Sequence, residues 1–276
     1  MCVKSIKRIL RKSRIVIGVY YCLKSILVFP LKFTSLKPFA DTTFPLRELF
    51  KPSKLYLFKT VSPYTRLKYA TLSNVYDLAN DIERRKAPGA YVECGVWKGG
   101  GAAVMGAVAK KFGSERMTWY FDSFEGMPEP TEKDKSGRGK KWLTGDIMGD
   151  VLKASVADVE EVAYYRLNLS RDKNIIIKGW FQDTLPKTKQ RIGQIAILRL
   201  DGDWYESTMT ALTELYDQVV QGGYVIIDDY GAWEGCRRAV HEFLDNRSIK
   251  PDLKFIGTYD PGAFSKTPPA YFQKPS

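Results

Sequence analysis

From Ala90 onward, short apolar segments alternate with segments of helical pattern, and this alternation constrains the fold more than any other feature. Continuous apolar strands joined by helices are typical of a mostly parallel sheet covered on both faces, so the sequence predicts an α/β fold. The predicted strands are residues 90–96, 117–124, 174–180, 194–202 and 224–230, with an antiparallel closing pair at 253–260 and 270–275. The predicted helices are residues 97–113, 156–167, 205–223 and 233–246.

The chain before this alternation divides into two further parts. At 276 residues with 44% hydrophobic residues, the chain is long enough for one large domain with an extension. Residues 1–40 form a basic, apolar N-terminal segment. Residues 41–88 contain several prolines followed by an amphipathic helical pattern over 64–85. Residues 89–276 are then the main domain, with 41–88 as a helical region beside it.

The positive charge is concentrated at the N-terminus. Nine lysines and arginines and no acidic residues precede Asp41, so they account for nine of the twelve net positive charges and leave only +3 for the remaining chain. A nucleic-acid-binding protein would carry a basic surface on its folded domain. Nucleic acid is therefore not expected as a partner.

Residues 1–40 combine a basic start with the apolar run IVIGVYYCLKSILVF, which Lys24 interrupts and Pro30 ends. A secretory signal would lead into a small-residue cleavage site, and no clean one follows. A spanning helix needs about 20 apolar residues, and this run is shorter. The pattern favours a segment lying on an anionic membrane surface; packing on the domain or on a partner subunit is the alternative. The expected location is the cytoplasm, with peripheral attachment to the inner membrane face.

Cysteine and histidine usage excludes several kinds of site. The four cysteines are widely spaced without a C-x-x-C motif, which argues against a disulfide framework and favours a reducing compartment. Cys94 and Cys236 lie in apolar surroundings and are expected in the core. His241 is the single histidine, so chemistry that needs a cluster of imidazoles is not available.

The carboxyl ends of the predicted strands are the first places to look for a site, because ligands of open α/β sheets bind there. The first strand ends in ECGVWKGGG, where glycines permit a tight turn and close approach of a ligand to the backbone. The motif is not G-x-G-x-x-G, so a plain turn is the alternative. Glu93 is more informative, because a carboxylate inside a buried strand needs a cationic or N–H partner.

The next two strands also end in candidate binding residues. Asp122 follows the second strand, where an acid can accept hydrogen bonds from both hydroxyls of a ribose; a helix N-cap is the alternative. Trp180 and Phe181 follow the third strand and could sandwich a flat ring, with Asp183 accepting from an exocyclic amine. Aromatic residues at such a place can equally belong to the core.

Three aspartates end the fourth and fifth strands, Asp201 in LRLDGDWYEST and Asp228 and Asp229 in GGYVIIDDYG. If these strands are neighbours, the three carboxylates lie together and repel one another, which raises their pKa values. A divalent cation relieves this repulsion. Oxygen ligands without His or Cys favour Mg²⁺ over zinc.

Two structural alternatives stay open for these acids. The aspartates could cap helices, or they could pair with Arg199, Arg237 or Arg238. Asp203 and Glu206 are expected to be first-turn acids of the helix that follows, where they complement its dipole, and are weaker candidates for the site.

Together these motifs resemble those of the macrocin O-methyltransferase family. The resemblance rests on PGAYVECGVWKGG, YFDSFEGMPEP, GWFQDTLP, LRLDGDWYESTM and GGYVIIDDYG…GCRRAV, in this order. It implies a Rossmann-like class I methyltransferase fold with a mostly parallel seven-stranded sheet and helices on both faces. It also implies an S-adenosylmethionine- and Mg²⁺-dependent enzyme that methylates sugar hydroxyls.

The resemblance also implies roles for individual residues. Residues 41–88 would include a loop that folds over the cofactor, in which Arg66 stands where family members often have methionine. Asp201, Asp228 and Asp229 would hold the metal, and Asp201 would be the general base. The residues implied to bind the cofactor are Tyr64, Thr65, Glu93, Gly95, Val96, Trp97, Asp122, Ser123, Gly179, Trp180, Phe181 and Asp183.

The acceptor is expected to be a glycan or a glycosylated small molecule. The N-terminal segment favours a cell-surface glycan or glycolipid, and a macrolide-type natural product is the alternative. A nicotinamide-dependent dehydrogenase is a weaker interpretation, because it leaves the aspartates unexplained. A catalytically idle, membrane-associated binding protein with the same fold is the alternative of another class. Members of the family that the chain resembles tend to self-associate, so a homo-oligomer is expected.

Overall fold

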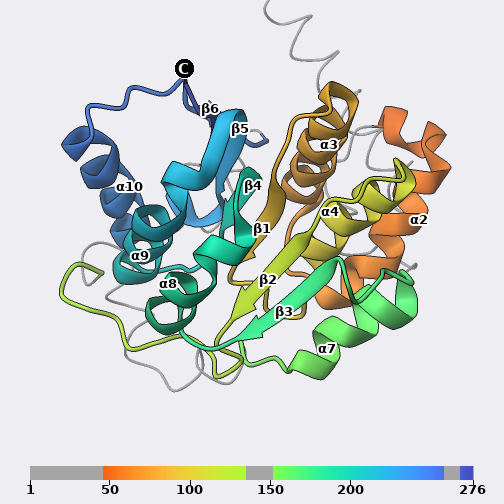
Figure 1. The fold of residues 1–276 in the computed structure, drawn as a ribbon, viewed down its shortest axis with the longest axis horizontal. Coiled ribbons are helices and arrows are strands. Elements are labelled where there is room, and N and C mark those ends of the chain that lie inside the picture. The colour runs from red at the N-terminus through yellow and green to blue at the C-terminus, as the bar shows by residue number, and fades with distance from the viewer. Residues whose placement is uncertain (1–45, 135–151, 258–267, 276) are drawn as a thin grey trace, which may run out of the picture.

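The computed structural model describes residues 46–134, 152–257 and 268–275. Its centre is a seven-stranded sheet in the order β3-β2-β1-β4-β5-β7-β6 (Figure 1). Strands β1 to β5 are parallel, and β7 is antiparallel to both β5 and β6. The strands are β1 (Ala90–Cys94), β2 (Thr118–Asp122), β3 (Asn174–Lys178), β4 (Ile195–Leu200), β5 (Val219–Ile227), β6 (Lys254–Phe255) and β7 (Ala270–Gln273). The predicted sheet is confirmed, and its strand order reverses between β1 and β4.

Helices cover both faces of this sheet. In Figure 1, α2, α3 and α4 lie on one side of it and α8, α9 and α10 lie on the other. The α-helices are α2 (Pro52–Val61), α3 (Tyr69–Arg85), α4 (Gly100–Lys111), α7 (Val156–Glu160), α8 (Phe181–Ile192), α9 (Tyr205–Leu215) and α10 (Glu234–Asn246). The shorter turns are η3 (Leu46–Phe50), η4 (Ser62–Tyr64), the π-helical η5 (Glu161–Arg166), η6 (Tyr216–Gln218) and η7 (Asp228–Tyr230).

Each face of the sheet has its own apolar core. Tyr91 of β1 belongs to a buried cluster with residues of α2, α3 and α4, whereas Val92, the next residue, belongs to a cluster with residues of α8, α9 and α10. Successive side chains of a strand point to opposite faces, and all residues of β1 are buried. Burial stabilises by about 1.5–3 kcal/mol per large apolar side chain. Strand β1 is therefore well packed and fixes the start of the loop between β1 and α4.

The helix predicted over residues 205–223 is wrong at its C-terminal end. α9 ends at Leu215 and, after η6, β5 begins at Val219, which pairs with Ile195 of β4. Gly222 has φ +73, which glycine adopts without strain, and the register of β4 against β5 shifts along this stretch. The glycine pair at 222–223 therefore lies within the strand and does not end a helix.

Two other predictions are confirmed. The helical stretch over 156–167 is present as α7 followed by η5, and the C-terminal antiparallel pair is present as β6 and β7, although β6 has only two residues. Helix α8 was not among the predicted elements. Pro186 lies inside it, which hides the helical pattern.

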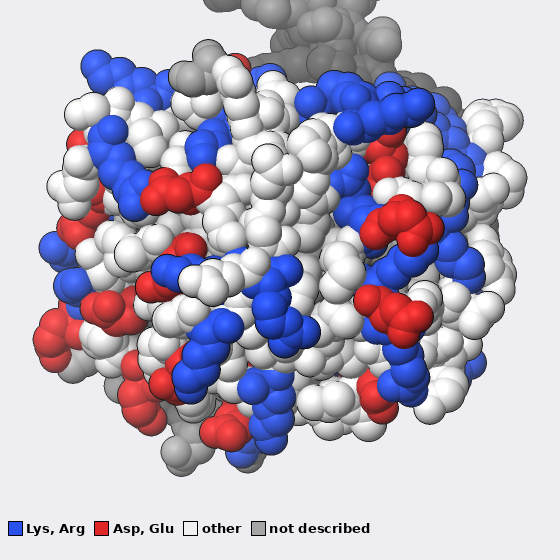
Figure 2. Space-filling model, viewed as in Figure 1, with Lys and Arg blue, Asp and Glu red and all other residues white. Residues whose placement is uncertain are grey.

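The surface agrees with the uneven charge of the sequence. On the face in Figure 2, lysine and arginine side chains are mixed with aspartate and glutamate. No helix within residues 46–134, 152–257 and 268–275 is long and apolar enough to cross a membrane. The predicted membrane-surface segment, residues 1–40, lies outside the described residues.

Candidate active site

The carboxyl ends of β1 and β4 touch through their backbones, and this contact lies at the centre of the site. The backbone N–H of Asp201 donates to the carbonyl oxygen of Cys94 at 2.8 Å. Gly95 follows with φ +89, and a Cβ atom there would overlap the carbonyl oxygen of Asp201. Glycine satisfies both demands, so the chain can leave β1 directly beside Asp201.

The turn between β1 and α4 also lies against the N-terminal helical region. A Cβ atom on Gly100 would stand 2.7 Å from the carbonyl oxygen of Tyr64 and 2.8 Å from Cβ of Thr65. A Cβ atom on Gly101 would stand 2.7 Å from Oε1 of Glu93. The loop with Tyr64 and Thr65 therefore lies beside the glycine turn.

Glu93 has a carboxylate that is only half satisfied. Arg199 donates from Nη1 to Oε1 at 2.6 Å, whereas Oε2 is buried without a hydrogen-bond partner among the described residues. Burial raises the pKa of Glu93 to about 8, against the lowering effect of Arg199. The indole N–H of Trp97 is also buried without a partner in this part of the chain. An open acceptor and an open donor on one cavity wall are groups that a zwitterionic ligand can satisfy.

Asp122 joins the end of β2 to the turn after β1. Its Oδ2 accepts the backbone N–H of Trp97 and its Oδ1 accepts that of Phe124, each at 2.8 Å. Burial raises the pKa of Asp122, although these hydrogen bonds lower it. Each carboxylate oxygen keeps a second lone pair, so Asp122 can still accept from two hydroxyls. Ser123 donates to the carbonyl oxygen of Gly126 at 3.0 Å and fixes the next turn.

The residues after β3 reach the same edge of the sheet. Gly179 has φ +138, and its N–H donates to the carbonyl oxygen of Asp122 at 2.9 Å. Trp180 and Phe181 stand at the start of α8 and line the cavity. Asp183 lies in the first turn of α8 with an exposed side chain, outside the cavity wall.

Asp201, Asp228 and Asp229 meet, as expected from neighbouring strands. β4 and β5 are adjacent in the sheet, and each aspartate offers one carboxylate oxygen within 4.8 Å of the others. Burial raises the pKa of Asp228 to about 6. It also raises the pKa of Asp229 well above its ordinary value, with a further contribution from the charge of Asp203. The cluster therefore holds more negative charge than its surroundings stabilise.

Arginine pairing accounts for only part of this charge. Arg199 contacts Oδ2 of Asp201 at 2.9 Å and Oδ1 of Asp228 at 2.8 Å, and it also binds Glu93. Arg238 pairs with Glu242 instead. No salt bridge reaches Asp229 within the described ranges.

The donor set fits a hard divalent cation. All three aspartates offer carboxylate oxygens, which suit Mg²⁺ or Mn²⁺. Oδ1 of Asp228 is buried and makes no well-aligned hydrogen bond to any described residue. A cation bound by Asp201, Asp228 and Asp229 would offset the burial and the repulsion that raise the pKa values of Asp228 and Asp229.

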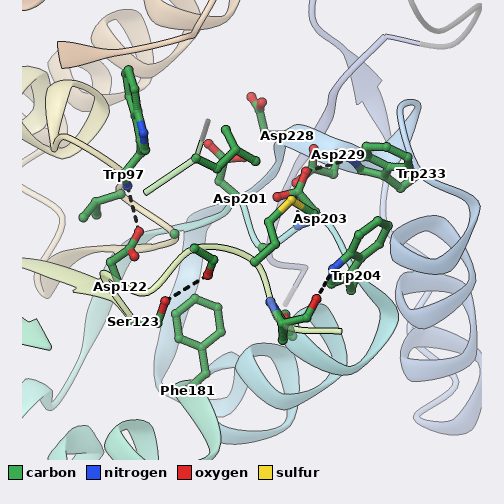
Figure 3. A pocket seen from close by; sticks show the side chains of 18 of the residues that line it. Trp97, Asp122, Ser123, Phe181, Asp201, Asp203, Trp204, Asp228, Asp229 and Trp233 are labelled. Carbon is green, nitrogen blue, oxygen red and sulfur yellow. Dashed lines mark hydrogen bonds between the residues drawn. The ribbon is translucent and has the colours of Figure 1, made fainter. Parts of the chain in front are cut away.

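One cavity of about 880 Å³ connects these groups. In Figure 3, Trp97 and Asp122 lie on one side of Asp201, and Asp228 and Asp229 lie on the other. A cavity of this size holds a nucleoside-sized ligand with room to spare. Its wall contains these predicted residues: Thr65, Glu93, Gly95, Val96, Trp97, Asp122, Ser123, Trp180, Phe181, Asp201, Asp228 and Asp229. Tyr64, Gly179 and Asp183 are not part of the wall.

Asp203 belongs to the cavity wall, although the sequence pattern places it in the following helix. It precedes α9 with φ +58, and its Oδ1 accepts the indole N–H of Trp233 at 2.7 Å. Its own N–H donates to Oδ2 of Asp229 at 2.9 Å. Burial raises the pKa of Asp203 to about 7, and the charge of Asp201 adds to this effect. Only its position two residues after Asp201 could have indicated this role.

Two tryptophans complete this end of the cavity. Trp204 and Trp233 lie with ring centroids 5.0 Å apart, and both line the wall (Figure 3). Trp204 donates its indole N–H to the carbonyl oxygen of Pro128 at 3.0 Å, which ties the start of α9 to the segment after β2. Sequence reasoning missed both residues, because a tryptophan near a strand end is equally typical of a core.

The chain matches a known family over most of its length. Residues 61–261 match the model described as Macrocin-O-methyltransferase (TylF). The chain is 38% identical over 194 residues to the 8-demethyl-8-(2,3-dimethoxy-alpha-L-rhamnosyl)-tetracenomycin-C 4'-O-methyltransferase of Streptomyces olivaceus, covering 70% of this chain and 72% of that protein. It is 33% identical over 191 residues to the mycinamicin III 3''-O-methyltransferase of Micromonospora griseorubida, covering 69% and 74%.

Solved structures show the same fold. The structure of the O-methyltransferase NovP matches with a TM-score of 0.66 and 32% identity, covering 77% of this chain and 83% of that one. A calicheamicin methyltransferase structure matches with a TM-score of 0.56 and 19% identity over 91% of each chain. The second match supports the fold alone.

Proposed function

This chain belongs to the macrocin O-methyltransferase family of S-adenosylmethionine-dependent O-methyltransferases, and from that premise we propose that it methylates a sugar hydroxyl with the help of Mg²⁺. The observation that carries the proposal is one cavity that joins the glycine turn after β1 to the aspartate cluster after β4 and β5. A methyl donor at the turn and a hydroxyl at the cluster would lie next to each other.

In this proposal the cofactor binds along the carboxyl ends of β1, β2 and β3. The open Oε2 of Glu93 accepts from the ammonium of the methionine part, and Asp122 accepts from the ribose hydroxyls. The side chain of Asp183 is exposed, so its assignment to the adenine has the least structural support. The remaining proposed contacts are Gly95, Val96 and Trp97 for the methionine part, Ser123 for the ribose, Gly179, Trp180, Phe181 and Asp183 for the adenine, and Tyr64 and Thr65 as the covering loop.

In this proposal the aspartates bind the metal, and one of them also accepts the proton. Asp201, Asp228 and Asp229 would hold Mg²⁺, whose positive charge would make two neighbouring sugar hydroxyls more acidic. Asp201 accepts the hydroxyl proton at a carboxylate oxygen. The resulting alkoxide attacks the methyl carbon of the sulfonium as the carbon–sulfur bond breaks, and the rest of the site contributes orientation and electrostatics.

Asp203 is a second candidate for the base. Its carboxylate faces the same cavity, and its described partner is the neutral Trp233 rather than a cation. Asp201, by contrast, shares one oxygen with Arg199. Asp203→Asn leaves the metal cluster intact, so a loss of turnover with unchanged ion uptake would assign the base to Asp203.

We propose a glycosylated acceptor, because the relatives are named for rhamnosyl tetracenomycin and mycinamicin substrates. The basic, apolar residues 1–40 favour a cell-surface glycan or glycolipid assembled at the inner membrane face. A soluble natural product is the alternative. A catalytically idle binding protein is the alternative of another class, and the clustered carboxylates argue against it, since such a cluster is costly without a ligand.

The test is methyl transfer itself. Full-length protein would be incubated with isotopically labelled S-adenosylmethionine and a panel of rhamnosides, glycolipids and macrolide glycosides, with Mg²⁺ or with EDTA. The proposal expects label on a sugar oxygen in the presence of Mg²⁺ and its loss with EDTA. Transfer that is equally fast in EDTA would reject the metal, and transfer to an aglycone hydroxyl would reject the sugar.

The N-terminal prediction has its own test. Full-length protein and a variant lacking residues 1–40 would be floated with vesicles of anionic or neutral lipid. The proposal expects binding of the full-length protein to anionic vesicles alone, weakened by salt. Equal flotation of both proteins would reject it. The predicted homo-oligomer would be checked by light scattering on the same proteins without vesicles.

A further inference from the structure

Arg199 is a fully buried arginine at the end of β4, between the proposed cofactor site and the proposed metal site. Its side chain is 0% exposed. Nη1 lies 2.6 Å from Oε1 of Glu93 and 2.9 Å from Oδ2 of Asp201, and Nη2 lies 2.8 Å from Oδ1 of Asp228. One guanidinium therefore contacts carboxylates at the ends of β1, β4 and β5.

The strand register brings these groups together. Arg199 is paired with Glu93 on β1 and with Ile226 on β5. Directly opposite residues of neighbouring strands place their side chains on the same face. The residues beside it in β4, Leu198 and Leu200, are buried and apolar on the other face. An isolated charge at this depth has a large desolvation free energy. The contacts with Arg199 therefore stabilise the guanidinium as well as the carboxylates.

The contacts use one oxygen of each carboxylate. Oε1 of Glu93, Oδ2 of Asp201 and Oδ1 of Asp228 face Arg199, which leaves the second oxygen of each for a ligand. The contact with Asp228 is close but poorly aligned for a hydrogen bond, because neither Nη2 nor Oδ1 has a hydrogen-bond partner among the described residues. Asp228 is therefore held to Arg199 by charge rather than by a well-aligned hydrogen bond.

We propose that Arg199 is a positioning residue that orients Glu93 for the cofactor and Asp201 and Asp228 for the metal. The inference rests on the proposed function. Because a guanidinium is a rigid planar fork, it fixes the directions of several carboxylates at once, which a lysine ammonium does not. Partners behind metal ligands typically change metal affinity by about 10- to 100-fold when they are removed.

A purely structural arginine is available as a matched control. Arg116 is nearly buried, pairs with Glu83 at 2.8 Å and donates to the backbone carbonyls of Ala87 and Gly89. It lies at the end of the sheet from which β2 begins, away from the cavity wall. Loss of Arg116 removes a comparable ion pair without touching either proposed site.

The experiment measures ligand affinity rather than turnover. Mn²⁺ and S-adenosylhomocysteine would each be titrated calorimetrically into wild type, Arg199→Met, Arg199→Lys and Arg116→Met, with binding expressed per folded molecule. Arg199→Met is expected to weaken both ligands by about tenfold or more. Arg199→Lys is expected to recover part of the loss. Arg116→Met is expected to lower the unfolding temperature while both affinities stay at the wild-type level.

Each outcome decides the inference. Wild-type affinities in a folded Arg199→Met, or in Arg199→Lys if the methionine variant does not fold, would overturn it. Equal losses in Arg116→Met would also overturn it, because they would show a general effect of destabilisation. If wild type takes up no Mn²⁺, the metal part of the proposed function fails separately. S-adenosylhomocysteine affinity in the variants then still decides whether Arg199 positions Glu93.

Discussion

The backbone N–H of Trp97 donates to Oδ2 of Asp122 at 2.8 Å and so ties the turn after β1 to the end of β2. Trp97 holds φ +50, a conformation that non-glycine residues adopt at a cost of about 1 kcal/mol or more. The hydrogen bond helps to stabilise this turn. Under the proposed function, Asp122 therefore has two tasks, shaping the turn after β1 and accepting hydrogen bonds from the cofactor.

Asp122→Asn is expected to weaken S-adenosylhomocysteine binding by at least tenfold, because an amide has one acceptor oxygen where the carboxylate has two. Calorimetric titration measures the change. Asp172→Asn is the control, since its side chain is exposed and outside the cavity wall. A larger loss at Asp172 than at Asp122 would contradict the assignment of the ribose end.

Gly95→Ala is expected to destabilise the fold by about 4 kcal/mol or more, at the upper end of single substitutions. A Cβ atom there would clash with the backbone of Asp201, and an alanine would also be strained at φ +89. Gly113→Ala provides the control, because Gly113 has φ +66 but nothing within 4 Å of its Cβ position. That change is expected to cost only about 1 kcal/mol. Urea unfolding compares the free energies of unfolding of the two variants. Equal losses would mean that the close approach of β1 and β4 does not determine the cost of a Cβ atom at Gly95.

The main strands could be predicted from the sequence, because apolar runs such as residues 90–94 and 195–200 are typical of a buried parallel sheet. The start of β5 could not. Val219 follows a helical pattern without a break, and its strand pairing with Ile195 is a contact between distant segments. Local propensity carries no information about such a partner.

The aspartate cluster could be predicted on the condition that the strands ending in Asp201 and in Asp228 and Asp229 are neighbours, and β4 and β5 are adjacent in the sheet. Asp203 could not, because its entry into the cavity depends on a left-handed backbone at φ +58. Helix-start patterns describe an acid at this place equally well. Trp233 reaches Asp203 from the start of α10, beyond β5 and η7, and only the tertiary fold determines this contact.

Trp233→Phe is expected to lower kcat/KM for the acceptor by about tenfold, the scale of one hydrogen bond to a charged group. The change removes the N–H that binds Oδ1 of Asp203 while keeping an aromatic ring beside Trp204. Steady-state kinetics with the acceptor varied measures the effect. Affinity for S-adenosylhomocysteine should not change, and a loss there would place Trp233 in the cofactor site instead.

Stability should depend on pH through Glu48, a nearly buried residue of η3 whose carboxylate lies 3.2 Å from Nζ of Lys54. Burial alone raises its pKa, but hydrogen bonds from Lys51 and Tyr69 and the charge of Lys54 lower the pKa of Glu48 to about 2 from its ordinary 4.5. Because the folded-state pKa is the lower one, the charge stabilises the fold above pH 4.5 and this contribution disappears as the pH falls towards 2.

Glu48→Gln should therefore lower the free energy of unfolding by about 2 kcal/mol at neutral pH. The difference from wild type should shrink as the pH falls below the ordinary pKa of a glutamate. Urea unfolding of both proteins at stepwise lower pH measures this. A difference that stays constant with pH would show that the charge of Glu48 does not contribute.

Titration of Mg²⁺ into the complex with S-adenosylhomocysteine, for wild type and for Asp229→Asn, shows whether the aspartate cluster holds the metal. Asp229 belongs to the aspartate cluster, and no described arginine or lysine forms a salt bridge with it, so its loss leaves the contacts of Arg199 intact. We expect uptake of one ion by wild type and none by the variant, with S-adenosylhomocysteine bound equally well by both. Tight binding of S-adenosylhomocysteine by wild type without any uptake of Mg²⁺ would contradict it.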